Sequence, residues 1–326
     1  MEGMKRLSPT AAATAVIPLL AGALLACSVL APGAAARDIH VNNATGDDRF
    51  TGRSLQRLED YGGPVRTIGR ALELAQPGDR IVLAKNDRPY HESITLAGNR
   101  HSEYPGSPLV IAGNGAILDG SQPVPEEAWE HYRGGVFRFR PPRAAHGNLF
   151  LDGRPATRVV PEYGAAVPPS LQPKEWCLLD GWIYFCVEPE KLPEDYPLGY
   201  AHLRTGITLY HVHGVAIADL TVQGFQLDGI AAANSARDVY LGGVTARGNG
   251  RAGVSVGGAS SVVLEGCLLG NNGEAQLLSL PYSQTETVNS VLLGNTAPGW
   301  LDRGGRMVID GQRAEGGRDE VDPERE

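Results

Sequence analysis

Charged side chains lie between short apolar runs in the glycine-rich stretch 207–299. His211 follows the first run, Asp228 precedes the second, and Arg237 follows the second. A histidine base, an arginine partner and a carboxylate can together take a proton and neutralise a negative charge, which suits elimination or hydrolysis. The pattern predicts a catalytic group of Asp228, His211 and Arg237, and the alternative is that these are solvated loop residues.

Four side chains around the same runs are predicted to bind substrate: Tyr210, His213, Asn234 and Arg247. The ring of Tyr210 could stack on a ligand, as could Trp176 and Trp182, although each of these could instead be buried. His211 and His213 could bind a metal from one face of a strand. No third ligand lies nearby in the sequence, so no metal site is predicted there.

The composition limits the partners of the chain. Its 29 Lys and Arg against 37 Asp and Glu give a formal net charge of −8 at pH 7. Such a chain lacks the basic face that nucleic acid requires. The 42 glycines argue against long helices, because each costs about 1 kcal/mol relative to Ala inside a helix. Asp47 and Asp48 could bind Ca²⁺, with a turn as the alternative, and no other cofactor is predicted.

The stretch 207–299 divides into four lines of 22 to 24 residues that begin at Ile207, Gly229, Gly253 and Gln276. Each line has an apolar alternation, a small polar turn and a second β-rich run that ends at Gly or Asn. This period without helices predicts the coils of a parallel β-helix, since the leucine scaffold of a leucine-rich repeat is missing. The predicted inward columns are Val215/Val239/Val262 and Ile217/Leu241/Leu264, and the predicted turn asparagines are Asn249, Asn271 and Asn295.

Alternation along the first run of each line leaves an outer face that is small and nearly uncharged. This face consists of Thr208, Tyr210, Ala231, Ala233, Ser255 and Gly257. The repeats contain no lysine, so an elimination site based on lysine is disfavoured there. Stacked coils lie about 4.8 Å apart, which lets turn residues of neighbouring coils meet. The site is therefore predicted at the edges of the strands.

The N-terminal part carries a second pattern. Apolar residues at helical spacing predict a helix over 64–76, which Pro77-Gly78-Asp79 ends. This run resembles the opening of the secreted pectate-lyase-like right-handed β-helix superfamily, in which a T-I-x-x-A-L-x-x-A-x-P-G-D capping helix precedes the first coils. The matching residues are Thr67, Ile68, Ala71, Leu72, Ala75, Pro77, Gly78 and Asp79. The resemblance covers roughly 38–121 and 203–299 and implies an all-β fold, a single-stranded right-handed parallel β-helix with an N-terminal capping helix.

Residues 122–202 break the period and are predicted to form a β-rich insertion. The runs L-F-L-D-G-R-P-A-x-R-x-x-P and W-x-x-x-D-G-x-I-Y-F look like the insertion of many secreted β-helix proteins of carbohydrate-processing type. A tight turn at Asp180-Gly181 would join two strands. A two-residue turn places Cys177 opposite Tyr184, whereas a four-residue loop places it opposite Cys186. A disulfide is therefore compatible with the sequence and not required by it.

The N-terminus has the pattern of an export signal. A short basic start, an apolar stretch over 11–31 and three alanines before Arg37 predict a signal peptide over 1–36. Cleavage after Ala36 would make the mature chain secreted or periplasmic, with no membrane span. The alternatives are an uncleaved anchor and a lipoprotein attached at Cys27 of the lipobox-like sequence L-L-A-C.

The mature chain is thus expected to be one β-helix over 37–311, followed by a disordered acidic tail over 312–326. The superfamily hosts lyases, hydrolases, epimerases and proteins without known activity, so the fold alone does not fix the function. The resemblance implies a secreted protein that binds or cleaves a polysaccharide or cell-surface glycan, by lyase-like or hydrolase-like chemistry. The alternative is a non-catalytic extracellular scaffold or adhesion module, which the small uncharged outer face favours.

Overall fold

The computed structural model describes residues 36–58, 61–102, 107–142 and 146–314. The predicted signal peptide up to residue 35, with Cys27, lies outside these ranges, as does most of the predicted acidic tail. The described chain is mostly β, as predicted, with two short α-helices and two 3-10 helices, Glu126–Ala128 and Pro193–Asp195. Its sheets are of two kinds, parallel in the repeats and largely antiparallel in the insertion.

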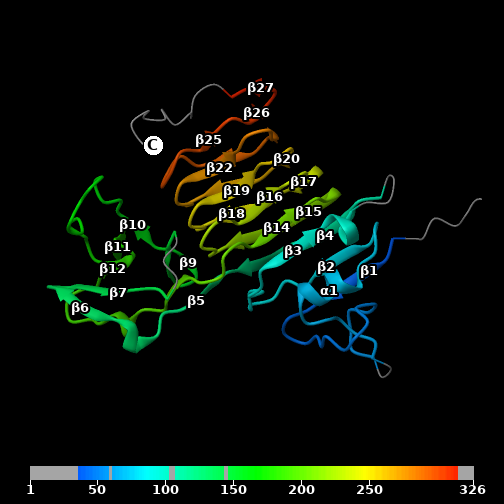
Figure 1. Cartoon of the computed structure of the whole chain (residues 1–326). Helices are drawn as coiled ribbons and strands as arrows, with labels where there is room; N and C mark the ends of the chain where they lie inside the picture. Colours follow the sequence, from blue (N-terminus) through cyan, green and yellow to red (C-terminus); the bar gives the residue numbers. More distant parts are fainter. Residues whose placement is uncertain (1–35, 59–60, 103–106, 143–145, 315–326) are drawn as a thin grey trace, which may run out of the picture. The chain divides into compact units, whose positions relative to one another are not determined.

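The largest sheet, called sheet A, gains one parallel strand from each coil (Figure 1). Its main strands are β1 (Asp38–Val41), β2 (Arg80–Leu83), β4 (Leu109–Asp119), β15 (His213–Gln223), β17 (Arg237–Gly242), β20 (Ser261–Glu265), β23 (Gln284–Val288) and β26 (Arg306–Ile309). A short antiparallel strand, β27 (Gln312–Arg313), pairs with β26 at the edge. A parallel branch continues from the end of β15 through β18 (Thr245–Arg247), β21 (Leu268–Gly270) and β24 (Val291–Leu292).

A second parallel sheet, sheet B, takes the other strand of each coil. Its strands are β3 (Ile94–Ala97), β14 (Ile207–Tyr210), β16 (Ile230–Ala233), β19 (Ala252–Val256), β22 (Ala275–Ser279) and β25 (Trp300–Asp302). Both predicted inward columns are confirmed, because Val215, Val239 and Val262 are neighbours in register, as are Ile217, Leu241 and Leu264. All six side chains are buried in one core, as period-two alternation on a half-buried sheet requires.

Two asparagine ladders cross the turns between sheets A and B, one residue apart. Asn249 and Asn272 are fully buried, and the Asn249 amide nitrogen donates to Oδ1 of Asn272 at 3.0 Å. Asn271 and Asn295 form a separate exposed ladder at 2.9 Å. All three predicted turn asparagines, Asn249, Asn271 and Asn295, thus lie at turns, but Asn249 belongs to the buried ladder and the other two to the exposed one. Asn271 takes the left-handed turn conformation, with φ of 56°, and this turns the next residue inward.

The predicted N-terminal helix is present as α1 (Ile68–Leu74). It begins one residue after Thr67, because the Thr67 side chain caps it by accepting from the Arg70 N–H at 3.1 Å. Ile68 and Leu72 pack in the same core as the strands. Glu92 accepts hydrogen bonds from the first two helix N–H groups, and burial raises the pKa of its carboxyl. A second short helix, α2 (Gly98–His101), follows β3.

The insertion between β4 and β14 forms two sheets of its own. One runs β10 (Thr157–Arg158), β11 (Glu175–Leu179), β12 (Trp182–Cys186), β7 (Val136–Phe139) and β6 (Glu130–Arg133). The other runs β5 (Ser121–Pro123), β13 (Leu198–Ala201), β8 (Leu149–Leu151) and β9 (Arg154–Pro155). An aromatic core that includes Phe139, Trp176 and Phe185 holds them together, so Trp176 has no face left for a sugar.

The sequence was compatible with a two-residue turn or a four-residue loop between β11 and β12, and the structure has the two-residue turn. Asp180 and Gly181 both have positive φ, and Cys177 faces Tyr184 with Cys186 on the diagonal. Both cysteines are free and buried. Burial raises the pKa of the Cys177 thiol to about 11.

Candidate functional site

The carboxylate of Asp228 is closed inside an ion pair. Asp228 lies just before β16 and is 1 % exposed. Arg251 donates to both of its oxygens, with Nε at 2.9 Å from Oδ1, and the Ser255 hydroxyl donates to Oδ2 at 2.8 Å. The hydrogen bond to Asp228 raises the pKa of Arg251. The two coils that carry these residues are thereby joined, and both carboxylate oxygens are occupied by protein donors.

His211 and Arg237 do not meet Asp228. The Asp228 carbonyl accepts from the N–H of Gly206, before β14, whereas the His211 N–H donates to Asn234, beyond the end of β16. The three residue steps of β16 alone separate the two ends by about 10 Å. The predicted convergence of Asp228 with His211 and Arg237 is therefore wrong, because parallel stacking aligns strand beginnings with beginnings. Their catalytic roles stay predictions that this geometry does not support.

Five of the predicted site residues do lie together, at the edge where sheet B turns into sheet A. They are Tyr210, His211, His213, Asn234 and Arg237. The rings of Tyr210 and His211 are in edge contact with centroids 4.3 Å apart. His213 pairs in register with Arg237, and its Nε2 lies 2.8 Å from Oδ2 of Asp238.

Arg247, the remaining predicted substrate contact, faces the insertion. Its Nε donates to the side-chain oxygen of Gln223 at 2.8 Å, and the Gln223 amide donates in turn to Asp119 and to the Gly153 carbonyl. Burial and the neighbouring charge of Arg154 lower the pKa of Arg247. Arg247 therefore belongs to the contact between the insertion and the repeats.

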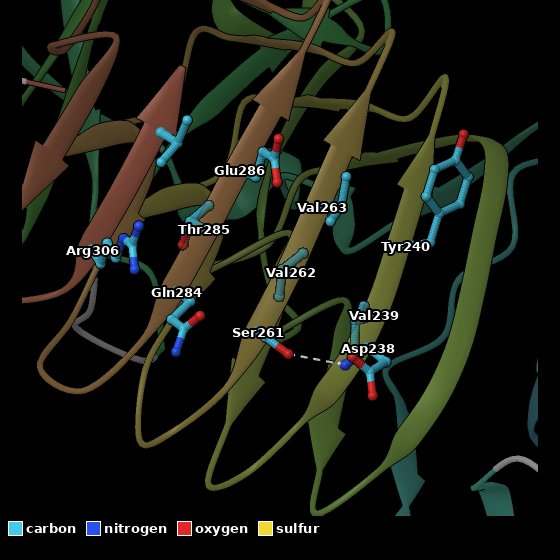
Figure 2. Close-up of a pocket in the computed structure, with 11 residues that line it drawn as sticks. Asp238, Val239, Tyr240, Ser261, Val262, Val263, Gln284, Thr285, Glu286 and Arg306 are labelled. Atoms are coloured by element: carbon cyan, nitrogen blue, oxygen red, sulfur yellow. Dashed lines mark hydrogen bonds between the residues drawn. The ribbon is translucent and has the colours of Figure 1, made fainter. Parts of the chain in front are cut away.

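A groove of about 520 Å³ crosses the outer face of sheet A over β17, β20, β23 and β26 (Figure 2). Two rows of side chains follow the strand register across it. The first row is Asp238, Ser261, Gln284 and Arg306, and the second is Tyr240, Val263, Glu286 and Val308. Neighbouring members are about 4.8 Å apart, so acidic, amide, hydroxyl, cationic and aromatic groups form a regular array. We call this surface the sheet A groove.

The ring of Tyr240 is held in place on this surface. Tyr240 is 39 % exposed, and its hydroxyl donates to Oε2 of Glu265 at 2.9 Å. That hydrogen bond raises the pKa of Tyr240. Gly242 leaves room for the ring, because a Cβ there would lie 2.7 Å from the ring carbon Cε1. The aromatic face is thus positioned before any ligand arrives.

The sheet A groove carries more negative than positive charge. Asp238 and Glu286 line it, Glu265 borders it through Tyr240, and Arg306 is the cation in its lining. Glu286 is exposed and makes no hydrogen bond or ion pair with any residue that the structure describes. Its carboxylate is therefore available to a ligand.

The sequence reasoning missed this groove because it followed only the first apolar run of each line. The same alternation applied to 237–242, 261–265 and 284–288 places Tyr240, Glu265 and Glu286 on the outer face of the second run. The signal was present in the sequence. The sequence carried no signal for the fixed position of the Tyr240 ring, because that position depends on contacts between two coils.

Metal ligands do not gather in the ranges that the structure covers, where no group of three or more His, Cys, Asp or Glu could hold an ion. Asp47 binds Arg49, and Asp48 accepts from Arg66 and Thr67 at the entry to α1. Their oxygens thus already have protein donors. Within the same ranges, no helix has the length and apolar character to cross a membrane.

No family model matches this sequence, and no curated protein does. Among solved structures, a glycoside hydrolase matches with a TM-score of 0.54 at 12 % identity over 82 % of this chain and 74 % of its own. A GH136 lacto-N-biosidase from Eubacterium ramulus gives 0.36 at 10 % identity, over 83 % of this chain and 56 % of its own. The pectate lyase Pel9A gives 0.30 at 11 % identity, over 87 % and 78 %. At this identity, the likeness to the glycoside hydrolase shows a similar fold alone.

Proposed function

We propose that this chain binds a neutral polysaccharide along the sheet A groove. The observation that carries the proposal is the exposed, pre-positioned ring of Tyr240 beside a row of polar groups that repeats with the strand spacing. An aromatic face packs on the apolar face of a sugar, and carboxylates and amides exchange hydrogen bonds with hydroxyls. The likeness in fold to a glycoside hydrolase supports carbohydrate as the ligand class.

The charge of the groove favours a neutral sugar over a uronate. Asp238, Glu265 and Glu286 face one cation, Arg306. A uronate carboxylate would be repelled by this arrangement, whereas neutral hydroxyls can donate to the same oxygens. This reading makes hydrolase-like recognition the better fit and gives a lyase acting on pectate less support.

Calorimetric titration with oligosaccharides from xylan, glucan and pectate tests the proposal. We expect the wild type to bind a neutral oligosaccharide and Tyr240→Ala to bind it more weakly. Tyr282→Ala is the matched control, because Tyr282 is 84 % exposed and lies outside the groove. Equal affinities in all three proteins would place binding elsewhere, and no binding of any sugar by the wild type would favour the scaffold alternative.

A second candidate function is hydrolysis of the bound chain by Glu265 and Glu286. They lie on neighbouring strands two positions apart, so their Cα atoms are about 8 Å apart. Glycoside hydrolysis uses two carboxyl groups about 5–5.5 Å apart for retention or about 6.5–9.5 Å apart for inversion, and one protonates the leaving oxygen while the other acts as base or nucleophile. Two glutamate side chains on Cα atoms at this spacing can reach either separation. Glu286→Gln and Glu265→Gln should each abolish reducing-end release and keep binding. Glu130→Gln, on an exposed strand of the insertion, is the control, and full turnover in either groove variant would exclude this pair.

We also propose that sheets A and B are the walls of a single-stranded right-handed parallel β-helix whose N-terminal end α1 caps. The support is the parallel register of every coil and the packing of α1 in the shared core. An experimental structure tests the handedness. Truncation of the chain before Asp79 should cause aggregation if α1 covers an open end.

Export is proposed together with cleavage after Ala36. The new terminus at Arg37 would be held in place, because its nitrogen already lies 3.2 Å from Oδ1 of Asp79 and its guanidinium binds the same carboxylate. Sequencing of the secreted N-terminus tests this. A chain lipidated at Cys27 would overturn it.

A further inference from the structure

A pocket of about 220 Å³ lies at the N-terminal end of sheet A, between β1, the segment 49–53 and α1. Four arginines line it, one from β1's flank, two from the segment and one from the helix: Arg37, Arg49, Arg53 and Arg70. Among the described residues of the lining, Asp38 is the acidic one, and both oxygens of its carboxylate already accept from Arg80. The lining is therefore mainly cationic, unlike that of the sheet A groove. We call this cavity the arginine pocket.

Two of these arginines are held by carboxylates that do not line the pocket. Asp79 accepts from Nε and Nη2 of Arg37 at 3.1 and 2.6 Å. Asp47 accepts from Nε and Nη2 of Arg49 at 3.0 and 2.6 Å. The Nη1 group of both arginines has no hydrogen-bond partner among the residues that the structure describes. Because a guanidinium is planar and rigid, each pair fixes the position of a donor that is still unused.

The other two arginines add further unused donors. Arg70 donates from Nε to the Asp48 carbonyl and from Nη1 to Glu73, and this leaves its Nη2 without a partner in the described ranges. Arg53 is exposed and makes no hydrogen bond or ion pair with any residue of those ranges. No ion pair therefore neutralises the charge of Arg53 there, and its whole guanidinium is available to a ligand.

These donors favour an anion with several oxygens. Arginine binds phosphate and carboxylate through charge-assisted hydrogen bonds, and it stays protonated in proteins. Four guanidiniums offer more donors than the two oxygens of a carboxylate can use, whereas a phosphate group presents three strong acceptor oxygens. The pocket exceeds the roughly 30 Å³ share of one water several times, so it also has room for part of a group that carries the phosphate. Phe50 and Leu74 give that group an apolar wall.

We propose that the arginine pocket binds a phosphate group, either the free ion or the monoester of a small molecule. The phosphate oxygens accept from the unused nitrogens of the four arginines, and the anion neutralises Arg53. The pocket shares no lining residue with the sheet A groove, so this site is independent of sugar binding there.

Calorimetric titration of the full chain with inorganic phosphate, glycerol 3-phosphate and glycerol, all at one sodium chloride concentration, tests the site. We expect saturable binding of both phosphates and none of glycerol. Tighter binding of glycerol 3-phosphate would identify a monoester as the ligand, and equal binding would identify the free ion. Arg53→Gln should weaken the affinity about 10-fold, because it removes charge-assisted hydrogen bonds. Arg133→Gln is the matched control, because Arg133 is an exposed arginine of β6 outside the pocket.

No saturable binding of either phosphate by the wild type would overturn the proposal. So would equal losses in Arg53→Gln and Arg133→Gln, which would show a general attraction to positive charge. Acetate bound as tightly as phosphate would contradict the selection of a phosphate group. Tyr240→Ala should keep the phosphate affinity of the wild type, so this site and the proposed sugar site can be tested separately.

Discussion

The ion pair at Asp228 and the sheet A groove are built by the same stacking of strands, and they differ in what their charged groups face. At Asp228, a neighbouring coil supplies Arg251 and Ser255, and the carboxylate is 1 % exposed. In the groove, the neighbours of Glu286 in its row are Val263 and Val308, which leave the carboxylate to solvent. Whether a charged residue of a repeat is enclosed in an ion pair or left open to solvent therefore depends on the residue one coil away.

The largest contrast should appear in stability. Asp228→Asn leaves Arg251 without its carboxylate, and breaking a buried pair in this way costs about 3–5 kcal/mol. Urea unfolding should show this loss. Glu286→Gln, the matched change in the groove, should stay within about 0.5 kcal/mol of the wild type. Similar losses in both variants would erase the distinction between the two regions.

The two asparagine ladders allow the same comparison of a buried with an exposed side chain, with a smaller expected change in stability. Asn272→Ala removes a buried amide that serves Asn249 and the Ala246 carbonyl, so it should cost about 1–3 kcal/mol. Asn295→Ala removes the matching contact of the exposed ladder, and its loss of unfolding free energy should be only a few tenths of the loss in Asn272→Ala. Equal unfolding midpoints for the two variants would show that burial does not separate the ladders.

A substitution in the sheet A groove should change the affinity for sugar and leave the stability of the chain nearly unchanged. Tyr240→Ala should weaken the affinity for a neutral oligosaccharide about 2–10-fold, the equivalent of about 0.5–1.5 kcal/mol for an aromatic contact. Its unfolding midpoint should hardly move, because the ring is partly exposed. Tyr240→Phe keeps the ring and loses the hydrogen bond to Glu265, so its affinity should lie between those of the wild type and Tyr240→Ala. An unchanged dissociation constant in Tyr240→Ala would remove the ring from the site.

The smallest expected effect is that of Gly242→Ala. A Cβ at this position would lie 2.7 Å from the Tyr240 ring and must displace it. The same titration should show a loss of affinity of about 2-fold, below that of Tyr240→Ala. A loss in Gly242→Ala that persists when Tyr240 is also replaced by Ala would show that the glycine acts by another route.

The inward columns could be predicted from the sequence because alternation with period two is written directly in runs such as 237–242. The grouping of Tyr210, His211, His213, Asn234 and Arg237 at one edge could also be predicted, because the turns in the sequence show where the strands end. The inner asparagine ladder could not be placed, because the left-handed turn at Asn271 decides which of two adjacent amides points inward. The partner of Asp228 was missed for another reason: Arg251 lies at the matching place before the next strand of sheet B, whereas the sequence analysis paired Asp228 with residues beyond the strand ends.

Amide hydrogen exchange of the full chain, with and without a saturating neutral oligosaccharide, tests the central claim most directly. The account predicts that protection rises in β17, β20, β23 and β26, the strands of the sheet A groove, and stays constant in β16 and β19 beside Asp228. Protection that rises in β16 and β19 and leaves the groove strands unchanged would contradict it.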